Sequence, residues 1–404
     1  MGVILIMAAV EILLPDADST AELRVYVHYP FCDNKCGYCA FPSVRKSSLE
    51  QSYLDALYLE ISRFRTQRNI ISIYIGGGTP SLINPSSLYT LIEAIKQLPL
   101  IKDKVEITLE LHPKHYNQEY VDGIVDAGVN RISLGIESFL PDKLALLNRP
   151  KTDIQNVLVP NHVSLSIDLM IGTIIDEHDI KSEIYKALKF KPDHISIYPL
   201  SLEMGSAYYF DRPSFISNNV GMQYEVCEME LTTAGYIRYE SSNYSLSDEH
   251  ACVHNMGYWN NDDYVGFGVA SNSKIGVISM ERNFDIVNYI TSISNNKYVD
   301  ASISILTNNE YAIETLLMGL RLASGVDIRR VLKRGDDIKA LMLVLDILCE
   351  SGLVILNEGI LRATRPMKYD VFLDVLNWGS EAKNGWRKIL PGRLLKNKNR
   401  NINN

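Results

Sequence analysis

Three cysteines near the start of the chain have the spacing C-x3-C-x2-C: Cys32, Cys36 and Cys39. Thiolates are the ligands that iron–sulfur clusters use, and three of them on one short loop can hold three corners of a [4Fe–4S] cube. The fourth iron then lacks a protein ligand, and an open position lets a metal centre take part in chemistry. A structural zinc site is the alternative interpretation, but such sites usually pair two ligand clusters, and no second C-x2-C pair follows.

A second candidate binding segment is the run Gly76-Gly77-Gly78-Thr79-Pro80, which directly follows the apolar residues that end at Ile75. Glycines let the backbone approach a ligand without an intervening Cβ atom, and exposed N–H groups in such a turn can bind a carboxylate. The spacing is not the G-x-G-x-x-G of a dinucleotide-binding loop. Because the run lies one structural unit downstream of the cysteines, it predicts a ligand-binding turn beside them.

The elements that must position these residues form a repeating pattern of short apolar runs and longer amphipathic segments. Such alternation predicts βα units around a parallel sheet. The expected strands are residues 24–29, 72–75, 105–111, 131–136, 163–169 and 194–200, with helices between them, as at 86–97 and 119–127. Six such units predict an α/β fold containing a partial (β/α)6 barrel. Sites in barrels of this kind lie at the carboxyl ends of the strands, where both motifs fall.

The pattern changes near Thr307, where Thr307 and Glu310 have the spacing of a capping box ahead of an amphipathic helix. A second helix is expected to end near Gly352, residues 354–361 to form a hairpin, and Pro366 to begin a third helix. Together these elements predict a small winged-helix-like α+β module. Many such modules bind DNA, but this one lacks a strongly basic helix, so a packing or partner role is favoured over a DNA-binding regulator.

The composition of the chain restricts its possible binding partners and its cellular compartment. The 404 residues carry a formal net charge of -8, so no overall positive field attracts nucleic acid, and none is expected as a partner. Six cysteines are too few for a disulfide scaffold, and free thiols point to the reducing cytoplasm.

The two terminal segments differ in character. The apolar residues 1–10 lack a basic start and are too few to span a membrane. Residues 379–404 form a basic tail, read either as a solvated segment or as a peripheral membrane or partner contact. Monomer and dimer both stay open.

The cysteine motif and the glycine run belong to an ordered set of motifs that resembles the radical S-adenosylmethionine (SAM) superfamily. Within it, the chain is similar to the oxygen-independent coproporphyrinogen III oxidases and the related HemW haem chaperones. The motifs are residues 26–32, 76–80, 130–135, 239–243, 254–259 and 266–271. We therefore divide the chain into an N-terminal extension (1–23), a radical SAM barrel (24–235), a linker region with an HNxxYW motif (236–306), the winged-helix-like module (307–378) and the basic tail (379–404).

The resemblance implies ligands for two cofactors. Cys32, Cys36 and Cys39 would hold a [4Fe–4S] cluster, whose open iron would bind the amino and carboxylate groups of SAM. The SAM contacts implied by position are Tyr26, Gly77, Gly78, Thr79, Glu110, Glu137, Arg149 and Asp168. Arg149 would pair with the SAM carboxylate, for which a guanidinium is well shaped, and Asp168 would bind the ribose hydroxyls. No side chain is assigned a catalytic role.

Three features resemble the chaperone branch. The oxidases typically continue the motif as C-x3-C-x2-C-x-C, whereas Phe41 stands at the last position here. Only 31 residues precede Cys32, fewer than in the oxidases. The run from His254 to Trp259 matches an HNxxYW motif that is associated with haem binding in HemW-like proteins. Imidazole is a normal axial ligand of haem, so the resemblance implies that His254 binds the iron.

The resemblance thus implies a SAM-binding [4Fe–4S] haem chaperone that delivers haem to haem-dependent respiratory enzymes. The alternative is an oxygen-independent coproporphyrinogen III oxidase, which would decarboxylate its substrate through a deoxyadenosyl radical in porphyrin biosynthesis. Whether the chain turns over SAM as an enzyme stays open.

Three departures from the family pattern are visible. Glu137 stands where the family usually has Gln, which replaces a donor-acceptor amide by a carboxylate that only accepts. The segment 152–168 is shorter than in relatives, so the helix between the fourth and fifth strands is shortened. Residues 172–176 replace the usual GLPGQT. These departures predict an altered charge near SAM and altered contacts on the substrate side.

Overall fold

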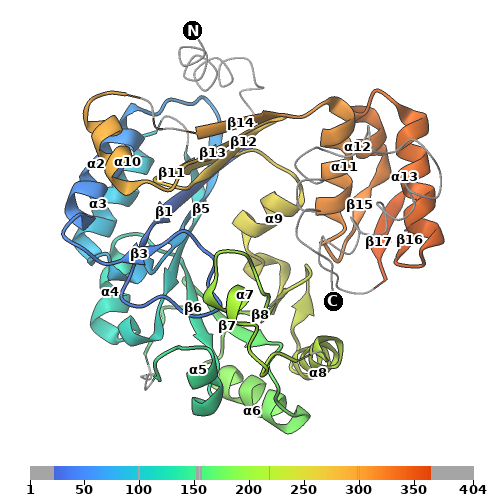
Figure 1. The fold of residues 1–404 in the computed structure, drawn as a ribbon, viewed down its shortest axis with the longest axis horizontal. Coiled ribbons are helices and arrows are strands. Elements are labelled where there is room, and N and C mark those ends of the chain that lie inside the picture. The colour runs from blue at the N-terminus through green and yellow to red at the C-terminus, as the bar shows by residue number, and fades with distance from the viewer. Residues whose placement is uncertain are drawn as a thin grey trace.

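The computed structural model of the chain describes residues 22–364, except residues 99–100, 152–153, 155–156, 218, 298 and 300. The apolar N-terminal run, the helix expected after Pro366 and the basic tail lie outside the described residues. The described part contains a large α/β body and a smaller module at its C-terminal end (Figure 1).

Six parallel strands form the centre of the twelve-stranded mixed sheet found in the described residues (Figure 1). In their order across the sheet they are β1 (Glu22–Tyr29), β4 (Asn69–Gly77), β5 (Ile101–Leu111), β6 (Arg131–Glu137), β7 (Ser164–Ile171) and β8 (His194–Pro199). Their faces alternate: Ile73 and Ile75 of β4 are fully buried in the main core, while Tyr74 between them lines a cavity. The predicted strands and the α/β partial-barrel class are confirmed.

Helices cover the outer face of this sheet, and α3, α4, α6 and α10 begin with a capping side chain. The main ones are α2 (Glu50–Arg63), α3 (Pro85–Lys96), α4 (Gln118–Asp126), α6 (Glu177–Leu188), α8 (Val220–Thr233) and α10 (Ile286–Ser294). The side chain of Asn84 accepts a hydrogen bond from the Ser87 N–H at the start of α3, and Asn117 does the same for Tyr120 in α4. The shorter α5 (Pro141–Leu146) lies between β6 and β7, where the sequence predicts a shortened helix, and α7 (Ala207–Asp211) follows β8.

Residues 236–306, named from the sequence as the region with the HNxxYW motif, extend the sheet on both of its sides. On one side of the sheet, β10 (Asn243–Ser245) pairs with β8 and with β9 (Ile237–Arg238). On the other side, β11 (Tyr264–Phe267) runs parallel to β1. The edge then continues through β12 (Asn272–Ile275), β13 (Ile278–Arg282) and β14 (Ala301–Ile305). The helix α9 (Val253–Trp259) connects the two sides, so the HNxxYW motif is built into the body of the fold.

The C-terminal module contains α11 (Asn308–Gly319), α12 (Ile328–Arg334) and α13 (Ile338–Glu350) with a sheet of β15 (Val326–Asp327), β17 (Ile360–Ala363) and β16 (Val354–Asn357). The predicted capping box is present, because Thr307 and Glu310 exchange hydrogen bonds at the start of α11. The hairpin is confirmed as β16 and β17, whereas β15 and α12 were not predicted. None of the described helices is long and apolar enough to cross a membrane.

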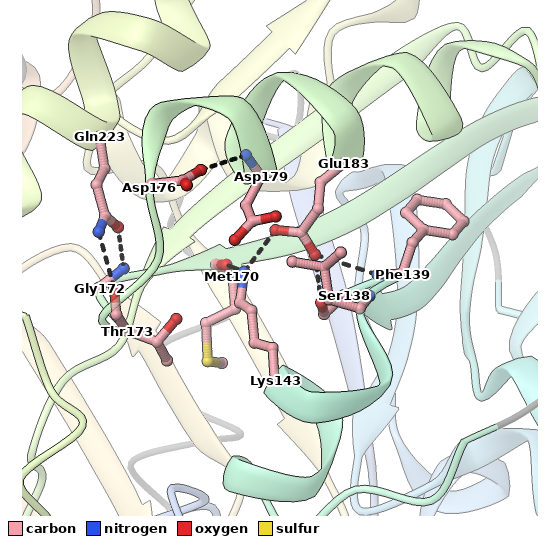
Figure 2. A network of polar contacts seen from close by, with 11 residues as sticks. Ser138, Phe139, Lys143, Met170, Gly172, Thr173, Asp176, Asp179, Glu183 and Gln223 are labelled. Atoms are coloured by element: carbon pink, nitrogen blue, oxygen red, sulfur yellow. Dashed lines mark hydrogen bonds and ion pairs between the residues drawn. The ribbon is translucent and has the colours of Figure 1, made fainter.

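A buried polar network fixes the turns that follow β6 and β7 (Figure 2). Lys143 of α5 donates to the Met170 carbonyl at the end of β7 and pairs with Glu183 of α6 at 2.7 Å. Glu183 also accepts hydrogen bonds from the Ser138 hydroxyl and from the Phe139 N–H, the latter at 3.1 Å. Buried charges are tolerated when they are paired and hydrogen-bonded, so this network ties α5 and α6 to both strand ends.

We predict that Lys143→Met lowers the free energy of unfolding by about 3–5 kcal/mol, because it leaves the Glu183 carboxylate buried without its cation. The double variant Lys143→Met/Glu183→Gln should recover part of this loss. Thermal unfolding followed by circular dichroism measures both. The exposed Lys181→Met variant is the matched control, expected to cost less than about 1 kcal/mol. Equal melting temperatures for the two lysine variants would contradict the assignment.

Candidate functional site

A cavity of about 2410 Å³ lies at the carboxyl ends of the parallel strands. The sequence-predicted residues that line it are Tyr26, Cys32, Cys36, Cys39, Gly78, Thr79, Glu110, Glu137, Arg149, Asp168 and His254. Gly77 is not in the wall, but its N–H donates to the Glu110 carboxylate at 3.1 Å. The structure therefore brings all of the predicted site residues together. Their roles toward cofactors stay predictions.

The cysteine loop follows β1 and carries three free thiols on the cavity wall. It leaves from β2 (Phe31–Cys32) and returns through β3 (Val44–Arg45), which pairs with β2. The Cys39 N–H donates to the Cys36 carbonyl at 3.2 Å, which folds the loop into a turn. Among the described residues, no three His, Cys, Asp or Glu side chains converge on one metal ion. The thiolates of a [4Fe–4S] cube need not converge on one ion, because each would bind a different iron of the cluster.

The glycine run packs directly against the cysteine loop. The Gly78 N–H donates to the Tyr29 carbonyl at 2.7 Å, and the Thr79 N–H donates to the Phe31 carbonyl at 2.8 Å. A Cβ atom on Gly78 would lie 2.6 Å from the Phe31 carbonyl oxygen and 3.0 Å from the Cys32 Sγ, so only glycine permits this approach. Gly77 has a φ of 119°, a conformation that favours glycine.

Three carboxylates face the cavity from neighbouring strands: Glu110 on β5, Glu137 on β6 and Asp168 on β7. Burial raises the pKa of Glu110 to about 7, and the charges of Asp168 and Glu137 act in the same direction. Glu110 accepts hydrogen bonds from the Tyr74 hydroxyl and the Gly77 N–H, both at 3.1 Å. A buried acidic group of this kind is stabilised by a positively charged ligand.

Arg149 connects the carboxylates to the cysteine loop. Its Nη1 lies 3.7 Å from the Glu137 carboxylate, 3.7 Å from the Cys36 Sγ and 3.4 Å from the Tyr38 hydroxyl, and its Nη2 donates to the Gly135 carbonyl. Burial raises the pKa of Glu137, and Arg149 opposes that shift. Glu137 has a φ of 64° at an irregularity in the β6–β7 pairing, so its backbone is held in a strained conformation at the strand end.

One supporting residue, His28, was not predicted from the sequence. Its Nε2 lies 2.9 Å from the Pro42 carbonyl, which can only accept, so Nε2 carries the proton. Its Nδ1 then accepts from the Tyr26 hydroxyl at 3.1 Å. Burial lowers the pKa of His28 to about 4, which keeps the ring neutral. This chain of bonds ties the end of the cysteine loop to β1. The available sequence signal was the alternation of Tyr26 and His28 on one strand face.

His254 lies on α9 with its ring packed against Tyr74, the ring centroids being 5.1 Å apart. Its Nδ1 is 2.9 Å from the Ser72 Oγ, and its Nε2 is 2.9 Å from the Tyr258 hydroxyl. The side chain is almost fully buried, and burial lowers its pKa to about 3. His254 is therefore neutral at physiological pH and reaches the cavity wall, but both ring nitrogens already have partners. Iron ligation would require one partner to move.

The N-terminal end of α9 is fixed from the sheet. Glu106 of β5 accepts hydrogen bonds from the Val253 N–H at 2.9 Å and from the His254 N–H at 3.0 Å. These bonds satisfy amide groups that a helix start leaves without partners. The position of His254 over β4 is therefore set by backbone as well as by side-chain contacts.

Comparisons with known proteins show the family of the chain. Residues 26–158 match the radical SAM superfamily, and residues 306–366 match the HemN C-terminal domain. The chain is 32% identical to the heme chaperone HemW of Buchnera aphidicola subsp. Schizaphis graminum over 69% of this chain and 76% of that protein. It is 36% identical to the heme chaperone HemW of Haemophilus influenzae over 63% of this chain and 70% of that protein. The chain belongs to the HemW family.

The fold is also found in a solved structure, that of coproporphyrinogen III oxidase (HemN) from Escherichia coli. The two superpose with a TM-score of 0.75 over 91% of this chain and 92% of that one, at 19% identity. This match confirms the fold predicted from the sequence, and the sequence matches above confirm the family resemblance. Membership of the radical SAM superfamily implies a [4Fe–4S] cluster and SAM as the cofactors of this HemW-family chain.

We predict that Cys36→Ser abolishes the broad visible absorbance of a reconstituted iron–sulfur cluster, because a hydroxyl does not replace a thiolate at iron. Anaerobic reconstitution with iron and sulfide, followed by absorbance and iron analysis, measures this. Cys349→Ser is the matched control, since Cys349 lies in the C-terminal module away from the cavity. Full iron content in Cys36→Ser would overturn the ligand assignment.

We predict that SAM binding to the reconstituted protein tightens as the pH rises through about 7. The direction of this pH dependence follows from the raised pKa of Glu110. The carboxylate that would accept hydrogen bonds from SAM forms only when the Glu110 carboxyl group loses its proton. Glu137→Gln removes a nearby negative charge and should move the midpoint of this pH dependence downward. Equilibrium dialysis across the pH range measures both.

The control for this pH dependence is Glu110→Gln, which should bind SAM weakly and without a transition near neutral pH. If Glu137→Gln left the midpoint and the affinity unchanged, the role of Glu137 beside SAM would be dropped.

Proposed function

We propose that this protein is a cytoplasmic haem chaperone that binds haem beside a SAM-binding [4Fe–4S] centre and delivers it to haem-dependent respiratory enzymes. The observation that carries the proposal is the position of His254, a neutral histidine on the wall of the same cavity that the three cysteines line. Relatives of this chain are named heme chaperones. A cavity of about 2410 Å³ has room for a porphyrin next to a second ligand.

At the cluster end of the cavity, the proposed ligands are Cys32, Cys36 and Cys39. A bound cluster supplies an open iron and one-electron chemistry. The proposed SAM contacts surround this position. The Gly77–Thr79 turn would bring backbone groups close, and the Arg149 guanidinium would pair with the SAM carboxylate. Glu110 would accept hydrogen bonds from SAM, Glu137 would contact SAM beside Arg149, and Asp168 would bind the ribose hydroxyls. Tyr26 lines the same cavity, and its hydroxyl donates a hydrogen bond to His28 Nδ1.

At the haem end, we propose that His254 binds iron through Nε2. The Ser72 hydroxyl holds Nδ1 from β4, inside the body of the fold, and such a partner on the second ring nitrogen is usual for a metal-bound histidine. Nε2 becomes available when the hydroxyl of Tyr258, itself on the cavity wall, moves away. The depressed pKa of His254 keeps the ring neutral, which is the form that binds metal.

The likeness to HemN does not by itself favour oxidase activity, because one fold serves many functions. Phe41 favours the chaperone, since it stands where the oxidases resembled by this sequence carry a further cysteine. Its side chain is 61% exposed at the rim of the cavity.

We predict that His254→Ala weakens haem binding and removes the spectral signature of histidine ligation, because the variant lacks the imidazole proposed to bind the iron. Tyr258→Phe should tighten haem binding by about 2- to 10-fold, since it removes a hydrogen bond that competes for Nε2. Absorbance titration with ferric haem measures both. The exposed His178→Ala on α6 is the matched control. Identical titrations for His254→Ala and the wild type would contradict the proposed ligand.

A further inference from the structure

The cavity wall contains one cation whose guanidinium has no hydrogen bond or ion pair among the described residues. The cationic side chains lining the cavity are Lys35, Lys114, Arg149, Arg282 and Arg321. Lys35 donates to the Phe41 carbonyl and Lys114 pairs with Asp33. Arg149 pairs with Glu137 and Arg282 with Glu60. Across the described residues, the guanidinium of Arg321 has no hydrogen bond or ion pair, and its Nε is buried without an acceptor.

The position of Arg321 is nevertheless well fixed. It follows α11 at the junction between the C-terminal module and the barrel. Its carbonyl accepts from the Ser241 hydroxyl at 3.2 Å, and the next residues pair with the barrel, the Ala323 N–H donating to the Tyr239 carbonyl at 3.0 Å. The guanidinium lies over the ring of Trp259, 4.1 Å from its centroid. Stacking of this kind holds the guanidinium plane without consuming its N–H groups.

Glu240 is the acidic side chain that acts electrostatically on Arg321, but the two do not form an ion pair among the described residues. Glu240 is buried, and burial raises its pKa, while Arg321 acts in the opposite direction. The two side chains form no ion pair among the interactions of the described residues, and one Glu240 oxygen, Oε2, has no hydrogen-bond partner. A partly buried guanidinium with free donors in a cavity is a site for an oxyanion, for which its planar fork is shaped.

We propose that Arg321, positioned by Trp259, binds a carboxylate of the haem that enters this cavity. The inference rests on the proposed haem-binding function and names the group that orients the porphyrin. His254 and Trp259 lie on the same helix, α9, and His254 and Arg321 line the same cavity. One end of the motif therefore offers a ligand to the iron, and the other end holds the cation for a propionate side chain. Trp259 is a positioning residue in this arrangement.

The test compares three probes: ferric haem, metal-free protoporphyrin IX, and haem dimethyl ester, whose carboxylates are capped. Arg321→Gln should weaken haem and protoporphyrin binding by about 10- to 100-fold, as expected for loss of a charge-assisted hydrogen bond, and leave ester binding unchanged. His254→Ala should weaken haem binding but not protoporphyrin binding. Absorbance and fluorescence titrations on the full chain provide the dissociation constants.

Two variants control for charge and for folding. Lys333→Gln removes an exposed positive charge of the same module outside the cavity and should change none of the three constants. Arg321→Lys keeps the charge and should restore part of the affinity for the free carboxylates. The wild type alone must also bind haem more tightly than its dimethyl ester, so the proposal is testable even if a variant folds poorly.

Equal weakening of haem and ester binding by Arg321→Gln would overturn the inference, because it would indicate a structural effect. Equal affinity of the wild type for haem and its ester would overturn it as well. In both cases haem binding itself would persist, and the proposed function would stand. Absence of haem binding in the wild type would overturn the proposed function together with the inference.

Discussion

The close contact between the Gly76–Pro80 turn and the cysteine loop is the constraint on which the rest of the site depends. Backbone hydrogen bonds from Gly78 and Thr79 to the carbonyls of Tyr29 and Phe31 hold the loop at the ends of β1 and β4. No side chain fits between the two segments, because a Cβ atom on Gly78 would meet both the Phe31 carbonyl and the Cys32 sulfur. Glu110 is attached to the same turn through the Gly77 N–H, and Arg149 reaches the loop at Cys36.

The charged side chains of the cavity come from different elements of the fold. The end near the cysteines gathers Glu110, Glu137 and Asp168 with one paired arginine, which suits a positively charged ligand. Arg321 reaches the cavity wall from the contact between the C-terminal module and residues 239–241, and it is the proposed partner of a haem carboxylate. The Tyr74 hydroxyl donates to Glu110, while the Tyr74 ring packs on His254. Tyr74 therefore connects a residue proposed to contact SAM with the residue proposed to bind haem iron.

Sequence patterns predicted the local and repetitive parts of this structure. Long apolar strands such as β4, and helix starts such as Thr307, carry their signal in adjacent residues and were found. The strands β9 to β14 were missed because they are short and their partners are distant in the chain, as with β11 beside β1. The helix α12 of the winged-helix-like module was also not predicted, because a helix of 7 residues shows little periodicity.

The candidate site shows the same difference between features signalled by adjacent residues and features that depend on distant contacts. The cysteines, the glycine run and the strand-end carboxylates were named from their motifs and meet in one cavity. The burial of His254 and the bonds to both of its nitrogens could not be predicted, because Ser72 lies far from it in sequence. His28 and Arg321 were not found at all, since each acquires its partners only through tertiary contacts.

Transfer of haem tests the central claim most directly. The haem-loaded protein would be mixed anaerobically either with membranes containing a haem-free respiratory enzyme or with apomyoglobin, which scavenges dissociated haem. We predict that haem reaches the respiratory enzyme faster than it reaches the scavenger, because a chaperone delivers by contact. Equal rates would mean that haem is merely released into solution, and the delivery function would be contradicted.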